Sequence, residues 1–257
     1  MANSLSTLTR RVVFAPLEGA GRTETVASRI RSAITLGIYA DGEQLPNEIA
    51  LAGQLSVSPV TLRDALRLIR DEGLVRTSRG RNGGTFVVSP RESNTALFEA
   101  ALRAKSAIEL RDLLDWQSAV MCHAAKFAAQ RALDREVDAM RESLAPLIRN
   151  IDAITARRTY SRVLIEIAAS GRSSRVNKTA IELQVEFAPL ATLVFRDVKV
   201  RDSLFAAVER VLDAIAARDD RDAAEQMSNA TALIAQRIQK IRHDLTHTRP
   251  EPEALTS

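Results

Sequence analysis

The chain has a single cysteine, Cys122, among 257 residues, so it cannot form an internal disulfide. One unpaired thiol fits a reducing compartment, and we expect a cytoplasmic protein. Aromatic residues make up only 4% of the sequence, so the hydrophobic cores have to be built mainly from Leu, Ile, Val and Ala. No apolar run approaches the roughly 18 residues that a membrane span requires, and we expect no membrane partner.

Residue patterns for catalysis and metal binding are equally scarce. There are three histidines, and only His123 has a cysteine beside it. Neighbours on a helix point about 100° apart, so a core cysteine beside an ordinary histidine is favoured over a metal site. The sequence contains no nucleophile elbow, P-loop or metal triad. We therefore expect no enzyme, no cofactor and no bound metal.

Positive charge is concentrated near the start of the chain. Residues 1–90 hold 11 arginines, no lysine and 8 acidic residues, whereas the other residues are almost balanced. One interpretation is composition drift in an arginine-rich proteome. The other is a domain that faces phosphate groups.

The pattern along the chain divides it into four segments. We expect a flexible N-terminal arm over 1–22, a first domain over 23–90, an all-helical domain over 95–247 and a disordered tail over 248–257. In the first domain, apolar spacing predicts helices that begin near Thr23 and near residue 47.

The third helix of the first domain carries a full set of local signals. Ser58 suits the N-cap and Pro59 the first helical turn, where its missing N–H costs nothing. Gly73 stands where a C′ residue belongs. Apolar side chains at i, i+3, i+4 and i+7 predict one buried face, and they are Leu62, Ala65, Leu66 and Ile69.

Two β-rich runs, 74–78 and 85–88, follow this helix and flank a glycine-containing turn. They predict a hairpin. Three helices with a two-stranded hairpin form a winged helix-turn-helix, which places its last helix in the major groove of DNA. The alternative is a small helical bundle with a solvated arginine face.

The leading end of the third helix and the hairpin tip are the expected DNA contacts. Arg63 can bind a guanine or a phosphate, and Thr61 can bind a base edge or a phosphate. The tip has two cations and little bulk, which suits a phosphate ridge or a narrow minor groove. The predicted DNA-binding residues are Ser58, Val60, Thr61, Arg63, Arg79, Gly80, Arg81 and Asn82.

The segment "GEQLPNEIALAGQLSVSPVTLRDALRLIRDEGLVRTSRGRNGG" closely resembles the signature of the GntR family of regulators. The resemblance covers residues 23–89. It implies that Ser58, Thr61, Arg63, Arg79 and Gly80 contact DNA. Pro59 stands where the family usually has an arginine that reads a guanine, which leaves the operator sequence open.

Residues 95–247 are expected to form an all-α antiparallel bundle, because Gly and Pro are rare there and no alternating apolar pattern occurs. The alternative interpretation is a helical bundle whose only role is dimerisation. The expected helices are 95–103, 106–132, 135–149, 152–170, 174–196, 201–218 and 221–246.

The runs "ELRDLLDWQSAVMCHAAKFAAQRA", "YSRVLIEIAASGRSSRV" and "VERVLDAIAARDDRDAAEQMSNA" resemble the helical effector domain of the FadR subfamily, often called the FCD domain. Many members of that subfamily bind a divalent metal through one aspartate and three histidines. The matching positions here are Tyr160, Leu164, Val208 and Ala230. Since Leu, Val and Ala have no lone pair to donate, the resemblance implies a metal-free, more apolar pocket.

Arg111, Asp115, Ser118 and Cys122 recur at spacings of 4, 3 and 4 and so form one helical stripe. If that stripe faces the pocket, Arg111 can hold a carboxylate or phosphate, and Tyr160 can donate its O–H. The alternative is an ion pair between Arg111 and Asp115 within the helix. The resemblance to metal-free members of the subfamily implies an effector such as a fatty acid or an acyl thioester.

These features predict a homodimeric transcriptional regulator that binds a palindromic operator in double-stranded DNA. The resemblance to the GntR family implies a repressor, and we expect its operator affinity to depend on a small-molecule effector. One alternative is a DNA-binding regulator whose helical domain only dimerises. A DNA-binding head fused to an enzyme is disfavoured, because the second domain lacks a strand-rich cofactor fold.

Overall fold

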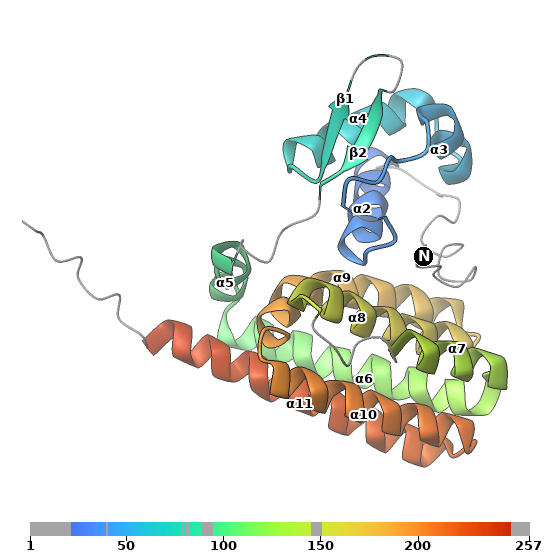
Figure 1. The fold of residues 1–257 in the computed structure, drawn as a ribbon, viewed down its shortest axis with the longest axis vertical. Helices are drawn as coiled ribbons and strands as arrows, with labels where there is room; N and C mark the ends of the chain where they lie inside the picture. Colours follow the sequence, from blue (N-terminus) through green and yellow to red (C-terminus); the bar gives the residue numbers. More distant parts are fainter. Residues whose placement is uncertain are drawn as a thin grey trace, which may run out of the picture.

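The computed structural model of the chain describes residues 22–39, 41–78, 80, 83–88, 95–144 and 151–247. Within them the fold is mainly helical, with one two-stranded sheet (Figure 1). The expected fold class, a winged helix-turn-helix followed by an all-helical part, is confirmed. The expected arm over 1–22 lies outside the described residues except for its last residue, and the tail over 248–257 lies outside them entirely.

The first part of the chain has its own hydrophobic core. It comprises α2 (Arg22–Thr35), α3 (Glu48–Leu55), α4 (Pro59–Asp71), β1 (Val75–Ser78) and β2 (Gly84–Val87). The four apolar residues predicted for the inner face of α4 are all buried in this core. Its remaining members come from α2, α3, the β-strands and the turn before α3.

Local signals set the ends of α3 and α4. The Asn47 side chain accepts the N–H of Ala50 at the start of α3, at 2.8 Å. The turn between the helices passes through Ser56, whose φ of 54° is left-handed. Gly73 has a φ of 74°, so the expected C′ position after α4 is confirmed.

The hairpin forms the wing. Val75 pairs with Val87 and Ser78 with Gly84, so its second strand begins and ends one residue earlier than the sequence predicted. The turn before α3 lines the edge of β2, because the Leu45 N–H donates to the Thr85 carbonyl at 2.8 Å. The wing is therefore braced along one edge by a segment far away in the sequence.

The second part of the chain is a helical bundle. Its elements are α5 (Thr95–Ala104), α6 (Ala107–Arg131), α7 (Asp134–Leu144), α8 (Ala153–Ser170), α9 (Ser174–Val194), α10 (Val198–Ala216) and α11 (Asp220–His247). Most helix boundaries lie within two residues of the prediction, and two differ by more. Helix α7 ends at Leu144, and residues 145–150 lie outside the described part. Helix α10 begins at Val198 rather than at residue 201, because the Asp197 side chain accepts the N–H groups of Lys199 and Val200.

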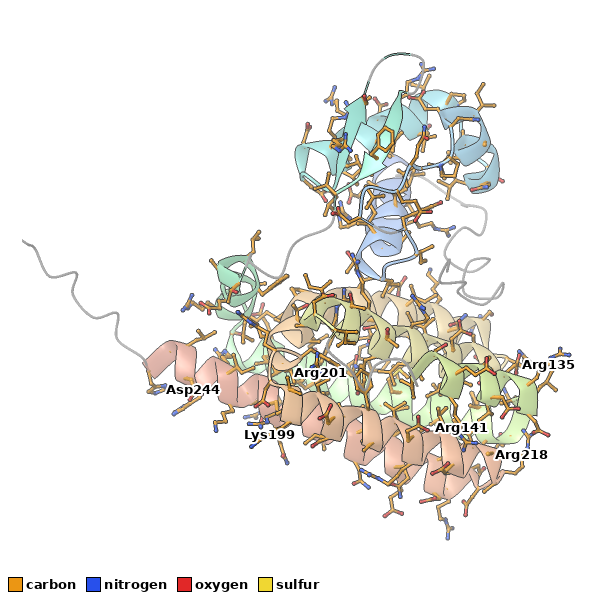
Figure 2. All side chains as sticks on the ribbon, viewed as in Figure 1. Arg135, Arg141, Lys199, Arg201, Arg218 and Asp244 are labelled. Carbon is orange, nitrogen blue, oxygen red and sulfur yellow. The ribbon has the colours of Figure 1, made fainter. Side chains whose placement is uncertain are left out.

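Helix α6 runs through the bundle and packs against α8, α9, α10 and α11. Four of its buried residues are alanines, which let neighbouring helices approach closely, and they are Ala124, Ala125, Ala128 and Ala129. At one end of the bundle, Arg141 pairs with Asp213 of α10, and Arg218 pairs with Asp134 of α7 (Figure 2).

Helix α2 joins the two parts. It contacts α4 on one side and α9 on the other, so that α3, α4 and the wing lie at the end of the molecule away from the bundle (Figure 1). A small apolar cluster spans the junction, with Ala33 and Leu36 from the α2 side and Ile165 and Ile181 from α8 and α9.

Two arginines of α8 also hold the C-terminal end of α2. Arg157 donates to the Thr35 carbonyl at 2.8 Å, and Arg158 donates to the Ile34 carbonyl at 3.2 Å. These are carbonyls of the last helical turn, where the helix dipole favours positive charge. The bundle is therefore attached to the helix on which α4 packs.

Candidate nucleic-acid interface

The leading end of α4 is exposed and ordered by its own cap. The Ser58 side chain accepts the Thr61 N–H at 3.1 Å, and its hydroxyl lies 2.9 Å from the Thr61 hydroxyl. Val60 beside them is 63% exposed. An apolar side chain there can contact a thymine methyl group. The structure thus brings Ser58, Val60 and Thr61 together at one exposed helix end.

Arg63 lies one turn further along α4 and is tied to α3. Its Nε donates to Glu48 Oε2 at 2.8 Å, and both side chains are largely exposed. The two residues border a shallow hollow that also includes Asn47, Ile49 and Ala50. Glu48 was not among the predicted site residues, and no spacing rule could find it, because it lies 15 residues from Arg63.

Three further arginines extend the exposed face. Arg67 and Arg70 are exposed on α4, and Arg76 is exposed on β1, with its guanidinium 5.0 Å from the Phe86 ring centroid. The sequence analysis did not name them. The sequence did carry a signal for the two arginines on α4, because positions 63, 67 and 70 lie at helical spacing on the side of α4 opposite its buried face.

At the wing tip, only Gly80 among the predicted contacts is described. It is exposed, with a φ of 110°, a conformation that glycine adopts without strain. The predicted contacts Arg79, Arg81 and Asn82 lie outside the described residues.

The predicted effector stripe on α6 is divided between two environments. Arg111 and Asp115 are exposed. Ser118 lies 3.1 Å from the Thr231 hydroxyl of α11 and 3.8 Å from Cys122 Sγ. Burial raises the pKa of the Cys122 thiol. The stripe therefore starts at the surface and ends against α11.

The four positions that match the metal ligands of the FadR subfamily are all buried. Tyr160, Leu164 and Val208 share one core, and Ala230 is also fully buried. The Tyr160 ring lies 5.2 Å from the Phe195 ring, and its hydroxyl has no hydrogen-bond partner. Burial strongly raises the pKa of Tyr160, so the phenol is a neutral donor.

Two buried amides near this core were missed by the sequence analysis. Gln117 on α6 and Gln184 on α9 are almost fully buried, and both amide atoms of Gln117 and the Nε2 of Gln184 have no hydrogen-bond partner. The sequence signal that could have identified them is a glutamine on an otherwise apolar helix face. Over the described ranges, no three His, Cys, Asp or Glu side chains gather closely enough to hold a metal ion.

None of the helices in the described part of the chain combines the length and the apolar character needed to cross a membrane.

Comparisons with known proteins agree with the geometry of the first part. Residues 22–87 match the model of the family described as bacterial regulatory proteins, gntR family. The chain is 36% identical over 174 residues to RmpR of Mycobacterium gastri, which is assigned as an HTH-type transcriptional regulator. It is 27% identical over 175 residues to NanR, an HTH-type transcriptional repressor of Escherichia coli.

These matches cover 68% and 64% of this chain, and the chain spans only 64% and 65% of those relatives' lengths. Among solved structures, McbR/YncC of E. coli is 15% identical with a TM-score of 0.47, over 89% of this chain and 100% of that one. That likeness is too distant to support a conclusion by itself. Residues 22–87, which form the helix-turn-helix and the wing, are therefore the part of the chain that is similar to the GntR family of bacterial regulatory proteins.

Proposed function

We propose that the protein is a homodimeric, sequence-specific DNA-binding regulator of transcription that acts as a repressor. One observation carries the proposal, namely the exposed, Ser58-capped leading end of α4 at the end of the molecule away from the bundle (Figure 1). A helix end that is capped by its own side chain and free of packing on one face is what a recognition helix requires.

In this mechanism α4 lies in the major groove, with Ser58, Val60, Thr61 and Arg63 toward the bases. Arg63 leaves Glu48 to bind a guanine, since an exposed ion pair is worth only about 0–1 kcal/mol. Arg67, Arg70 and Arg76 then bind phosphates on either side of the groove. The wing residues Arg79, Gly80, Arg81 and Asn82 are the proposed contacts to a phosphate ridge or to the adjacent minor groove.

A dimer follows from the geometry of recognition. One α4 reaches only a few base pairs, and two copies related by a two-fold axis read a palindrome. Helix α6 carries two large apolar side chains at the surface, Ile108 at 81% and Trp116 at 53% exposure. Burial of these side chains between two copies would remove apolar surface from water, which supports α6 as part of the dimer contact.

Effector control is proposed through the helical part. The Tyr160 hydroxyl and the two buried glutamines offer hydrogen bonds that no protein group uses. An acid or acyl thioester remains the proposed ligand class. The second candidate function is a regulator whose bundle only dimerises, and it is favoured by the close packing of aliphatic side chains at Leu164, Val208 and Ala230.

Footprinting on the DNA upstream of the protein's own gene tests the proposal. We expect protection of two half-sites whose centres lie about 10 base pairs, or a multiple of that, apart. Thermal melting with a panel of acids and acyl thioesters, with and without a chelator, then separates the two candidates. A bundle that only dimerises gives no shift with any ligand, and stabilisation by zinc that is lost on chelation would contradict the metal-free assignment.

A further inference from the structure

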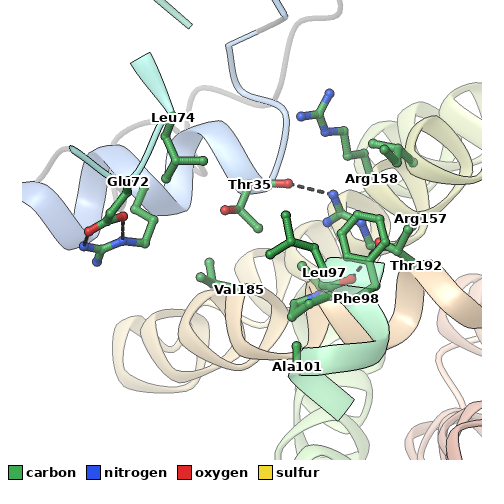
Figure 3. Close-up of a pocket in the computed structure, with 14 residues that line it drawn as sticks. Thr35, Glu72, Leu74, Leu97, Phe98, Ala101, Arg157, Arg158, Val185 and Thr192 are labelled. Carbon is green, nitrogen blue, oxygen red and sulfur yellow. Dashed lines mark hydrogen bonds and ion pairs between the residues drawn. The ribbon is translucent and has the colours of Figure 1, made fainter. Parts of the chain in front are cut away.

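A partly open cavity of about 420 Å³ lies at the junction of the two parts, and we call it the junction cavity (Figure 3). One side is formed by α2 and by the turn between α4 and β1, through Arg31, Thr35, Glu72 and Leu74. The facing wall is mostly apolar, from α5 and α9, and consists of Leu97, Phe98, Ala101, Val185, Ala188 and Pro189. The cavity therefore touches both parts of the protein.

The charged groups of the junction cavity do not balance. Glu72 is already paired with Arg31, which donates to both of its carboxylate oxygens, at 2.8 and 2.5 Å. The other two charged lining residues are Arg157 and Arg158, both cations. Asp152 and Asp41 lie close enough to Arg158 to favour its charge, whereas no acidic side chain among the described residues does the same for Arg157.

Arg157 is the group that remains unsatisfied. It is 3% exposed, and its one hydrogen bond goes to the Thr35 carbonyl, leaving Nε and Nη1 without partners. Within the described residues it forms no ion pair with an acidic side chain. Burial, with a smaller contribution from Arg158, lowers the pKa of Arg157 to about 9. A buried cation without a counter-ion is strongly unfavourable, so an anion placed here would be bound tightly.

Capping α2 does not account for this arrangement. A single N–H of Arg157 satisfies the Thr35 carbonyl, and a neutral donor would serve that purpose without a buried charge. The unpartnered Nε and Nη1 of Arg157, by contrast, suit an oxyanion, because arginine binds carboxylates through more than one N–H.

We propose that the junction cavity is an effector site that binds an apolar monocarboxylate, with the carboxylate on Arg157 and the hydrocarbon tail along α5 and α9. Its volume equals that of roughly 14 water molecules at about 30 Å³ each, so a straight-chain acid close to decanoate fits. This site is distinct from the residues around Tyr160. Its role as an effector site depends on the proposed function, whereas ligand binding itself does not.

The position of the site gives a route to DNA affinity. The ligand would lie between α2, on which α4 packs, and the helices α5, α8 and α9 of the bundle. A ligand that fits one placement of the two parts better than another shifts the population toward that placement. In a dimer this shift changes the spacing of the two α4 helices and therefore the fit to the operator.

Calorimetric titration of the full-length protein with decanoate and with decanol tests the binding. We expect decanoate to bind at least ten-fold more tightly, since only the acid can pair with Arg157. Arg157→Met should weaken decanoate binding at least ten-fold. Arg201→Met is the matched control, because Arg201 (labelled in Figure 2) is also buried and donates to a backbone carbonyl, that of Ile151, and neither residue lines the cavity. It should change affinity less than two-fold.

Ala101→Phe provides a second variant that leaves Arg157 intact. Ala101 is half-buried on α5, so a larger side chain there fills the cavity without entering a closed core. We expect at least a ten-fold loss of decanoate affinity. Equal binding of acid and alcohol, no binding of decanoate, or full binding by Arg157→Met or Ala101→Phe would overturn the assignment.

Operator binding is measured separately, with and without decanoate. We expect decanoate to change operator affinity several-fold in the unmodified protein and in Arg201→Met, but not in Arg157→Met. Tight decanoate binding with no change in operator affinity would refute the effector role. A protein that ignores duplex DNA but binds decanoate with the expected variant pattern would refute the proposed function and leave the ligand site standing.

Discussion

Replacing Arg63 by alanine tests the proposed recognition helix most specifically. A bidentate contact from arginine to guanine contributes about 1–3 kcal/mol, and breaking the exposed pair with Glu48 takes up to about 1 kcal/mol of that. Arg63→Ala should therefore weaken specific binding by about 1–2 kcal/mol per half-site, or roughly 5- to 30-fold, and the effect applies twice in a symmetric dimer. Fluorescence anisotropy with a labelled operator duplex measures it.

Replacing Glu48 by glutamine should have the opposite effect on operator affinity. It releases Arg63 and removes a negative charge near the phosphates, so operator affinity should rise by up to about five-fold per half-site. In the Arg63→Ala background most of that gain should disappear, because the released partner is absent. Arg111→Ala, at an exposed arginine on α6, is the control and should leave affinity unchanged. Equal operator affinity of Arg63→Ala and the unmodified protein would refute the assignment of α4.

Four further predictions concern stability and reactivity. Ser58→Ala removes the acceptor for the Thr61 N–H and should lower the free energy of unfolding by about 0.5–2 kcal/mol in urea titrations. Gly171→Ala places a methyl group 2.9 Å from Phe127 Cβ and should cost about 1–3 kcal/mol. Gly53→Ala, in open space within α3, should stabilise the protein by about 0.5–1 kcal/mol, and the opposite order of these two glycine variants would contradict the packing described. Because burial raises the pKa of Cys122, less thiolate is present near pH 8, and Ellman's reagent should react more slowly with the folded protein than with the urea-unfolded chain. Equal rates would show an exposed thiol.

The recognition helix could be predicted from sequence because its signals are local. The Ser58 cap, Pro59, the four buried apolar positions and Gly73 all lie within 16 consecutive residues, and each depends on neighbours within about one helical turn. The same holds for the wing, which is displaced by only one residue on its second strand.

Features that depend on distant contacts could not be predicted. Arg157 meets Thr35 across 122 positions, so nothing near it in the sequence marks it as a buried cation at the junction. Spacing correctly places Arg111 and Cys122 on one stripe of α6. It cannot show that α11 covers the Cys122 end while the Arg111 end stays in solvent, because that depends on how α11 crosses α6.

The central claim, that the leading end of α4 and the arginines around it bind DNA, is tested most directly by the salt dependence of operator binding. In the proposed dimer Arg67, Arg70 and Arg76 of both copies would make six phosphate contacts, so affinity should fall about 10³-fold between about 50 and 200 mM salt. Anisotropy on the footprinted duplex should show that steep decline for both the unmodified protein and Arg63→Ala, with Arg63→Ala weaker throughout. Affinity that does not respond to salt, or no binding to duplex DNA at 50 mM salt, would contradict the account.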